Sequence, residues 1–379
     1  MSDDFLPIKA IDHVEFYVGN AKQAAHFYRT GFGFAHSAYS GLETGNRETA
    51  SYVMAQGNIR LVLTAALGPD HPIARHAHLH GDGVAVIALS VPDAASAYQE
   101  TTQRGATGAI KPTQIEDDHG VYRYSAIRAY GDTVIKFVDR SDYGRNFAPG
   151  YSAAGNGNGK RSSNGERNDG SRFAHKGIGL AHIDHMVGNV ELGAMNRWVQ
   201  FFAETMGFSQ LLHFDDKDIA TEYSALMSKV MQNGTGKVKF PINEPAEGKK
   251  KSQIQEYLDY YYGPGVQHLA LSTGDIIATV EELRDRGIDF LRVPTTYYEV
   301  LEERVGKINE PVDKLAELGI LVDRDEEGYL LQIFTKPVED RPTVFYEIIE
   351  RHGSRGFGKG NFKALFEAIE REQDLRGNL

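Results

Sequence analysis

Two histidines and one glutamate in the second half of the chain are the residues best suited to metal chemistry: His185, His268 and Glu347. His268 lies in VQHLAL and Glu347 in VFYEII, and both segments are typical of strands. Because side chains alternate along a strand, each group shares a face with apolar residues. An ionised glutamate on an apolar face is costly unless a cation compensates it. Two imidazoles and one carboxylate on one face form the facial triad that binds non-haem Fe(II).

The chain repeats itself, and the repeat provides an internal comparison for these three positions. In the aligned segments, His185 corresponds to His13 and His268 corresponds to Val86. Glu347 corresponds to Phe137 if the threonines that precede the two strands are aligned. The first half therefore keeps one polar group of the three. A lone histidine beside a strand is usually an ordinary core or surface residue, but three groups at matched places favour a metal site. His182 in AHIDH is a rival ligand, and the alignment with the first IDH selects His185.

Four pairs of segments recur in the same order in the two halves. The longest pair has no gaps and runs from Gly83 (GVAVIALSVPDAASAYQETTQRGA) and from Gly265 (GVQHLALSTGDIIATVEELRDRGI). Each segment predicts a strand, a turn with Asp, and an amphipathic helix closed by glycine. Each half is thus predicted to be a strand–helix–strands unit that is itself doubled. Strands dominate with helices on one side, so the fold class is α+β.

Residues 152–177 separate the two halves and are rich in Gly, Ser and Asn without an apolar period. Such a segment cannot bury a core and is typical of a flexible linker. We expect an N-terminal non-catalytic domain over 1–151 and a C-terminal iron-binding domain over 178–379. Its last segment predicts an amphipathic helix over 361–376 with Asn361 as N-cap. GFGKG before it would let this helix move as a lid, and a fixed terminal helix is the alternative.

Composition narrows the class of protein. The chain has 379 residues, 41% hydrophobic and 25% charged, which suits two globular domains. Cysteine is absent, which excludes disulfides and thiolate metal sites. The net charge of −11 argues against nucleic acid as a partner. No apolar run reaches the ~20 residues of a membrane helix, and the acidic N-terminus is unlike a signal peptide. We therefore expect a soluble, cytoplasmic protein without a membrane partner.

Long segments resemble the 4-hydroxyphenylpyruvate dioxygenase family of the vicinal-oxygen-chelate superfamily, over essentially the whole chain. They include FPINEP at 240–245, KKSQI at 250–254, GVQHLAL at 265–271, ELGILVDRDEEGYLLQIFTKP at 317–337, DRPTVFYEIIER at 340–351 and GFGKGNFKALFEAIE at 356–370. The resemblance implies two tandem domains, each a doubled βαβββ module forming a half-open barrel with outer helices. It implies one Fe(II) per subunit on the same three ligands. It also implies conversion of 4-hydroxyphenylpyruvate and O₂ to homogentisate and CO₂ in tyrosine catabolism, by a homodimer or homotetramer.

The resemblance further implies a shell of substrate-binding residues: Ser224, Pro241, Asn243, Gln253, Gln267, Gln332, Phe334, Phe345, Phe357 and Phe362. Four of them are expected to act in catalysis: Gln267, Gln332, Phe334 and Phe362. Ordinary interpretations remain for several members. Phe334 and Phe345 would suit a core, Pro241 and Asn243 a turn, and Gln253 a solvated helix.

Three other activities are compatible with this pattern. Hydroxymandelate synthase has the same substrate, metal and fold but oxidises the benzylic carbon; large residues at Phe334 and Phe362 favour attack on the ring instead. A glyoxalase or a ring-cleaving dioxygenase of the same superfamily is the second alternative. A glyoxalase would need a fourth protein ligand, and the first half has no Glu at the aligned place. A metal-free binding protein is the third alternative, and metal analysis after anaerobic purification separates it from the others.

Overall fold

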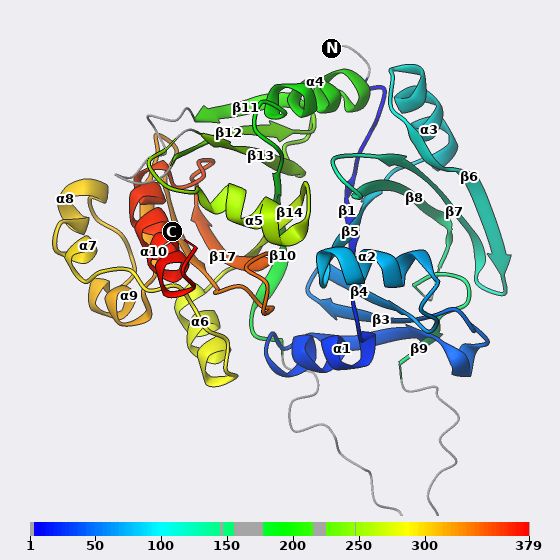
Figure 1. Ribbon diagram of the computed structural model, residues 1–379, viewed down its shortest axis with the longest axis horizontal. Coiled ribbons are helices and arrows are strands. Elements are labelled where there is room, and N and C mark those ends of the chain that lie inside the picture. Colours follow the sequence, from blue (N-terminus) through cyan, green and yellow to red (C-terminus); the bar gives the residue numbers. More distant parts are fainter. Residues whose placement is uncertain (1–3, 145–146, 155–176, 215–224, 247, 379) are drawn as a thin grey trace, which may run out of the picture. The chain divides into compact units, whose positions relative to one another are not determined.

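The computed structural model describes residues 4–144, 147–154, 177–214, 225–246 and 248–378. The chain forms two compact units, each with its own sheet (Figure 1). The first comprises Met1–Ile178 with Thr205–Gly207, and the second comprises Gly179–Glu204 with Phe208–Leu379. Among the described residues, the structure contains no helix with the length and apolar character needed to cross a membrane.

The first unit is built on one sheet with the strand order β6-β7-β8-β5-β1-β4-β3-β2-β9. The strands are β1 (Ala10–Tyr17), β2 (Ala35–Ser40), β3 (Thr49–Gln56), β4 (Ile59–Ala66), β5 (Gly83–Ser90), β6 (Gly108–Asp117), β7 (Gly120–Arg128), β8 (Val134–Tyr143) and β9 (Ser152–Ala153). The helices packed with this sheet are α1 (Ala21–Thr30), α2 (Pro72–His80) and α3 (Ala94–Gln103), with a 3-10 turn η1 (Leu42–Thr44).

The second unit has a sheet with the order β11-β12-β13-β10-β14-β17-β16-β15. The strands are β10 (Leu180–Asn189), β11 (Ser209–Phe214), β12 (Ala225–Gln232), β13 (Lys239–Ala246), β14 (Gly265–Thr273), β15 (Leu321–Arg324), β16 (Tyr329–Phe334) and β17 (Phe345–His352). The helices are α4 (Met195–Met206), α5 (Gln253–Tyr261), α6 (Ile276–Asp285), α7 (Thr296–Glu299), α8 (Leu301–Val305), α9 (Val312–Leu318), η3 (Lys359–Asn361) and α10 (Phe362–Leu375).

Both sheets have the same topology. The two central strands run antiparallel, β1 beside β5 and β10 beside β14. Each central strand is flanked by a parallel strand from the end of its own module: β4, β8, β13 or β17. Each unit is therefore a βαβββ module written twice and curled into a half-barrel (Figure 1). The predicted α+β class and doubled modules are confirmed.

Local signals in the repeated segment explain where its helices begin and end. Asp93 and Asp275 are the N-caps of α3 and α6, and each side chain accepts backbone N–H bonds from the first turn. Beyond the helix ends, Gly105 and Gly287 have φ of +104° and +84°. Residues with side chains rarely adopt these angles, which is why glycine ends both helices.

The sheet register corrects one position of the internal alignment. Corresponding neighbours across adjoining strands are His13–Ala88–Lys136 in the first sheet and His185–Ala270–Glu347 in the second. The counterpart of Glu347 is therefore Lys136, not Phe137. Matching the threonines before the two strands misses a one-residue difference in their approach, and a slip of one residue turns a side chain to the other face. The register confirms that His268 corresponds to Val86.

The range 152–177, predicted as a linker, begins inside the first sheet. Ser152–Ala153 form β9 and pair with β2, so these two residues belong to the first unit. Residues 155–176 lie outside the described part of the chain.

Candidate metal centre

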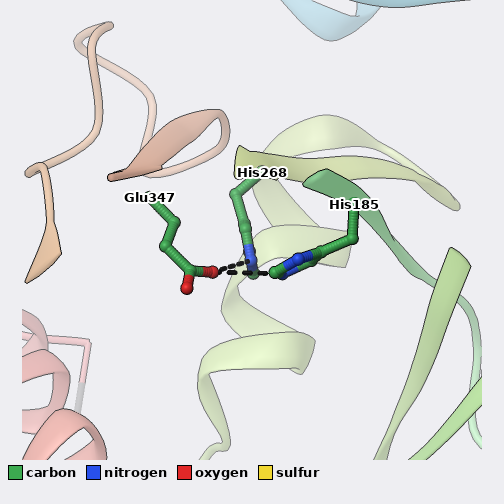
Figure 2. Close-up of side chains that lie close together, drawn as sticks. All are labelled: His185, His268 and Glu347. Atoms are coloured by element: carbon green, nitrogen blue, oxygen red, sulfur yellow. Dashed lines mark ion pairs between the residues drawn. The ribbon is translucent and has the colours of Figure 1, made fainter. Parts of the chain in front are cut away.

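Three adjacent strands of the second sheet, β10, β14 and β17, bring His185, His268 and Glu347 together. Glu347 Oε2 lies 3.1 Å from His185 Nε2 and 3.4 Å from His268 Nε2. Figure 2 shows the three side chains pointing toward one another, and their ligand atoms all lie within 4.8 Å of each other. All three residues are buried. The rival His182 is exposed, and its Nδ1 lies 2.7 Å from Ser272 Oγ instead.

These separations suit a metal ion. Atoms about 2.1 Å from one ion and at right angles around it lie about 3 Å apart. Each of the two nitrogens lies at nearly this distance from the carboxylate oxygen. The donor set, two imidazoles and one carboxylate, is that of non-haem iron sites with open coordination positions.

The far side of each imidazole is held by an acceptor. With the proton on Nδ1, His185 donates to Asp184 Oδ1 at 2.8 Å, and His268 donates to Gln267 Oε1 at 3.0 Å. In that tautomer both Nε2 lone pairs are free to face a metal. Asp184 is in turn bound by Arg351 through two bonds of 2.8 Å, from Nε and Nη2. The bidentate pair fixes the carboxylate that orients His185.

Burial and charge determine the protonation of these groups. Burial would raise the pKa of Glu347, but the two imidazoles lower it to about 2, so the carboxylate is ionised. Burial also lowers the pKa of His268 below its usual value and keeps that ring neutral. Burial opposes charge on His185 too, yet the carboxylates of Glu347 and Asp184 raise its pKa. The ionised carboxylate of Glu347 thus lies where a cation would bind.

A largely apolar pocket opens onto the triad. It has an empty volume of about 580 Å³, with open solvent at its mouth included, which is in the range of small-molecule sites. Phenylalanine rings border the ligands: Phe345 stacks on His268 with centroids 4.7 Å apart, and Phe357 meets His185 edge-on at 4.9 Å. Aromatic rings therefore enclose the triad at the end of this pocket.

Comparison with known proteins identifies the family. A family model described as the Glyoxalase/Bleomycin resistance protein/Dioxygenase superfamily matches residues 10–139 and 179–333. The 4-hydroxyphenylpyruvate dioxygenase of Dictyostelium discoideum is 48% identical over 98% of this chain and 100% of its own length. That of Yarrowia lipolytica is 46% identical over 98% of this chain and 94% of its own. The chain belongs to the 4-hydroxyphenylpyruvate dioxygenase family.

Solved structures agree with this family. A triple mutant of 4-hydroxymandelate synthase from Streptomyces coelicolor is 32% identical, with a TM-score of 0.84 over 97% of this chain and 100% of that one. A xylose isomerase-like TIM barrel/4-hydroxyphenylpyruvate dioxygenase fusion protein is 21% identical, with a TM-score of 0.73 over 97% of this chain and 53% of that one. The second likeness supports the fold alone. Both agree with the tandem vicinal-oxygen-chelate architecture.

Most residues expected from the family resemblance do line the pocket: Pro241, Asn243, Gln253, Gln267, Phe334, Phe345, Phe357 and Phe362. Ser224 lies outside the described residues. Gln332 is not among the lining residues. It is 1% exposed on β16, and its amide packs so tightly against Gly358 that a Cβ there would collide with it. The substrate contact expected for Gln332 therefore stays a prediction.

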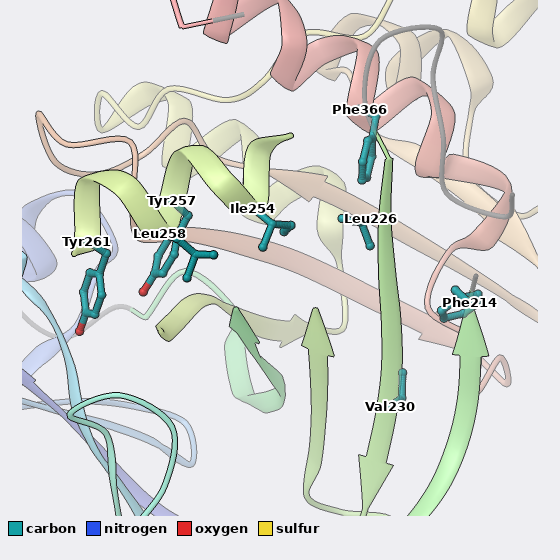
Figure 3. Close-up of a cluster of buried hydrophobic side chains, with 8 residues drawn as sticks. All are labelled: Phe214, Leu226, Val230, Ile254, Tyr257, Leu258, Tyr261 and Phe366. Carbon is teal, nitrogen blue, oxygen red and sulfur yellow. The ribbon is translucent and has the colours of Figure 1, made fainter. Parts of the chain in front are cut away.

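The terminal helix of this family member covers the pocket. Phe362, Leu365, Phe366 and Ile369 all face into it, as the amphipathic spacing predicts. Figure 3 shows Phe366 in a buried cluster with residues of β11, β12 and α5. The prediction for Asn361 is wrong in one respect, because its side chain forms no N-cap bond. It is fully buried and instead accepts a 2.6 Å bond from the hydroxyl of Tyr297.

Sequence reasoning missed the Asp184–Arg351 pair and several lining residues: Val187, Phe214, Leu226, Ser228 and Val230. A signal for the pair was present. Both halves have Asp before the repeated histidine and Arg four positions after Lys136 or Glu347. No signal in one strand alone could have revealed the lining residues of β11 and β12, because their orientation depends on how the sheet curls.

Proposed function

We propose that this chain is an Fe(II)-dependent dioxygenase that converts 4-hydroxyphenylpyruvate and O₂ to homogentisate and CO₂. The observation that carries this proposal is the buried triad of His185, His268 and Glu347 at the end of an aromatic pocket. Relatives 44–48% identical over nearly the whole chain have the name of that enzyme. One iron per chain and a role in tyrosine breakdown are parts of the same proposal.

Fe(II) bound by three protein ligands supplies open positions at which a 2-oxo acid and O₂ can meet. The chain's own contribution is to hold the ligands in place. Asp184 and Gln267 fix the two imidazoles, so that both Nε2 atoms face the ionised Glu347 before any ligand binds. Ligands held in this way need little reorganisation during the reaction.

The pocket would bind the substrate by its two ends. The 2-oxo acid end would face the triad, and the phenol end would lie deeper among neutral polar groups. Ser228, Asn243 and Gln253 line the pocket and offer hydroxyl and amide groups to the substrate's oxygens. Neutral groups suit a phenol better than a charge does. Phe334 and Phe345, whose rings meet edge-on with centroids 6.3 Å apart, would form an aromatic wall against the substrate ring.

Gln267, Phe334 and Phe362 are the residues that we propose to contact the reacting groups. Gln332 stays a proposed substrate-binding residue as well, and its amide lies against Gly358 at the start of η3. That contact would set the position of the segment leading to α10.

We propose that α10 excludes water from the reaction. Its residues Phe362, Leu365 and Phe366 form an apolar cover over the pocket. Water exclusion strengthens electrostatic interactions at a metal and prevents side reactions. Movement of this helix would admit the substrate and release the product.

Oxygen uptake by the anaerobically purified chain tests the function. With 4-hydroxyphenylpyruvate, uptake should require added Fe(II), and the product should be homogentisate with one CO₂ released. Iron analysis should give one equivalent that supports turnover. No uptake in the presence of both iron and substrate would refute the proposal.

The alternative product is 4-hydroxymandelate, and one observation favours considering it: the likeness to the synthase structure at 32% identity. The identity to curated 4-hydroxyphenylpyruvate dioxygenases is higher, at 44–48%. Product chromatography separates the two activities. The homodimer or homotetramer expected from the family resemblance is likewise a proposal, and sedimentation equilibrium would determine the assembly.

A further inference from the structure

A second group of metal-ligating side chains converges in the second unit: Glu310, Glu350 and His352. His352 Nε2 lies 3.0 Å from Oε1 of Glu310 and 3.0 Å from Oε1 of Glu350. The three ligand atoms lie within 4.8 Å of one another, as in the triad. Within the described ranges, these are the two places where three such groups come together.

This group lies on the opposite face of the sheet from the triad. Side chains alternate along β17, so Glu347 faces the pocket while Glu350 and His352 face the other side. Glu350 Oε2 confirms that direction, because it accepts a 2.7 Å bond from the Ile276 N–H at the start of α6. Glu310 comes from the segment between α8 and α9. None of the three lines the pocket beside the triad.

Hydrogen bonding does not account for this arrangement. His352 Nε2 is buried and has two carboxylate oxygens at 3.0 Å, yet it forms a hydrogen bond with neither among the described residues. Glu310 Oε2 is also buried and forms no hydrogen bond in this part of the chain. A buried carboxylate oxygen without a partner is costly. A cation that Glu310 binds through both of its oxygens would remove that cost.

Two of the ligands are held in position independently of any ion. Glu350 is fixed through Oε2 by the α6 backbone, which leaves Oε1 to face His352. The His352 ring stacks on Tyr329, with centroids 4.5 Å apart and planes at 13°. The hydroxyl of Tyr329 lies 3.3 Å from Glu310 Oε1 and so also positions the third ligand. The group is therefore preorganised, with its His352 side chain 30% exposed to solvent for access.

We propose that Glu310, Glu350 and His352 form a second divalent cation site, separate from the catalytic iron. One imidazole nitrogen and two carboxylate oxygens suit a borderline ion such as Zn²⁺, with water completing the coordination. An ion there links the Glu310 segment to the end of β17. The site takes no part in the proposed chemistry, because it faces away from the pocket.

Equilibrium dialysis of the metal-free full-length chain against Zn²⁺ tests this site. The wild-type chain should bind two equivalents, one in the triad and one in the second site. Glu347→Ala should remove the first and keep the second, whereas Glu310→Gln should remove the second alone. Glu303→Gln, an exposed charge-matched control on α8, should still bind two. Glu310→Gln should also keep Fe(II)-dependent oxygen uptake.

The proposal is overturned if Glu310→Gln binds as much Zn²⁺ as the wild-type chain, or if Glu347→Ala binds none. Far-UV circular dichroism and the unfolding midpoint establish that each variant folds. Should Glu310→Gln be unfolded, His352→Gln replaces it, since that change removes a ligand at a partly exposed position. Retention of two equivalents by folded His352→Gln equally contradicts the site. Loss of oxygen uptake in every protein would count against the proposed dioxygenase and leave this binding result intact.

Discussion

The two halves of the chain contain the same buried polar network but only one complete ligand set. The networks are Asp12–His13–Arg140 and Asp184–His185–Arg351. The His–Asp distances are 2.7 and 2.8 Å, and the Arg Nε–Asp Oδ2 distances are 2.7 and 2.8 Å. Even the neighbouring ring is repeated, since Phe147 and Phe357 each lie 4.9 Å edge-on from their histidine.

Two positions distinguish the halves. Where the second half has His268 and Glu347, the first half has Val86 and Lys136. The charge of Lys136 affects the pKa of His13. Burial lowers the pKa of His13, and Lys136 lowers it further. The first half therefore has the Asp12–His13–Arg140 network, but it has no carboxylate at the position that corresponds to Glu347.

This comparison separates support from function. The Asp–His–Arg network exists with or without the other two ligands, so it is part of how this module folds. Removing one partner of a buried ion pair is strongly destabilising. The network therefore stabilises the fold of both halves. The proposed metal chemistry depends on the two further positions. The following experiments alter one side of the comparison at a time.

The largest effect should come from making the second half resemble the first. Glu347→Lys should lower Fe(II)-dependent oxygen uptake by at least ~100-fold, more than the loss typical of residues behind the ligands. The charge beside His185 and His268 would then repel a cation. Iron content and oxygen uptake measure the loss, with Glu347→Gln as a milder variant for comparison. Iron bound at the wild-type level would contradict the assignment of this ligand.

Removal of residues 357–379 should abolish turnover while leaving iron binding largely intact. This segment includes α10, which covers the pocket but supplies none of the three ligands. Oxygen uptake and iron analysis on the same preparation separate the two properties. Full activity of the truncated chain would show that α10 is merely a docked terminal helix.

An intermediate effect is expected for Asp184→Asn, with Asp12→Asn as its matched partner. Loss of the Asp184 charge should weaken Fe(II) binding by about 10–100-fold, because His185 loses the group that orients it. Asp12→Asn should leave iron binding unchanged. Each change should lower the free energy of unfolding by ~3 kcal/mol, since each leaves a partly buried arginine without its carboxylate. Iron titration and urea unfolding give the two measurements.

Equal loss of iron affinity in both variants would mean that these aspartates act only through folding. Arg351→Lys then serves as a further check on the second half. It keeps the positive charge but loses the bidentate bonds to Asp184, so its iron affinity should fall between those of wild type and Asp184→Asn.

The smallest effect should be a gain in the first half. The double change Val86→His with Lys136→Glu places a second imidazole and a carboxylate beside His13. This variant should bind one Zn²⁺ equivalent more than the wild-type chain, measured by equilibrium dialysis, with Lys136→Glu alone as the control. No added binding would mean that the first sheet does not bring these positions together as the second does.

Much of the candidate site could be predicted from the sequence because its signals are local and occur twice. His185 and His268 stand out only when the two copies are aligned, and Glu347 stands out as a carboxylate on an otherwise apolar strand face. The N-caps of α3 and α6 could also be predicted, because an N-cap is formed by residues within one helical turn. The apolar stripe of α10 follows from helical spacing alone.

Other features depend on contacts between distant segments. Arg351 binds Asp184 across 167 positions of the chain, and the repeated Asp and Arg do not by themselves show that the two side chains meet. Gln332 shares a face with Phe334 along β16, yet its amide meets Gly358 and does not line the pocket. Asn361 occupies a capping position, but the hydroxyl of Tyr297 takes its side-chain oxygen.

The sequence by itself determined the doubled α+β modules and indicated three candidate ligand residues, because periodicity, capping and internal repetition are properties of short segments. Only the tertiary structure showed that Lys136 is the residue of the first half that corresponds to Glu347, since strand register depends on pairing between remote segments. It alone also brought Glu310 to Glu350 and His352, through the packing of the segment between two short helices against the far face of β17.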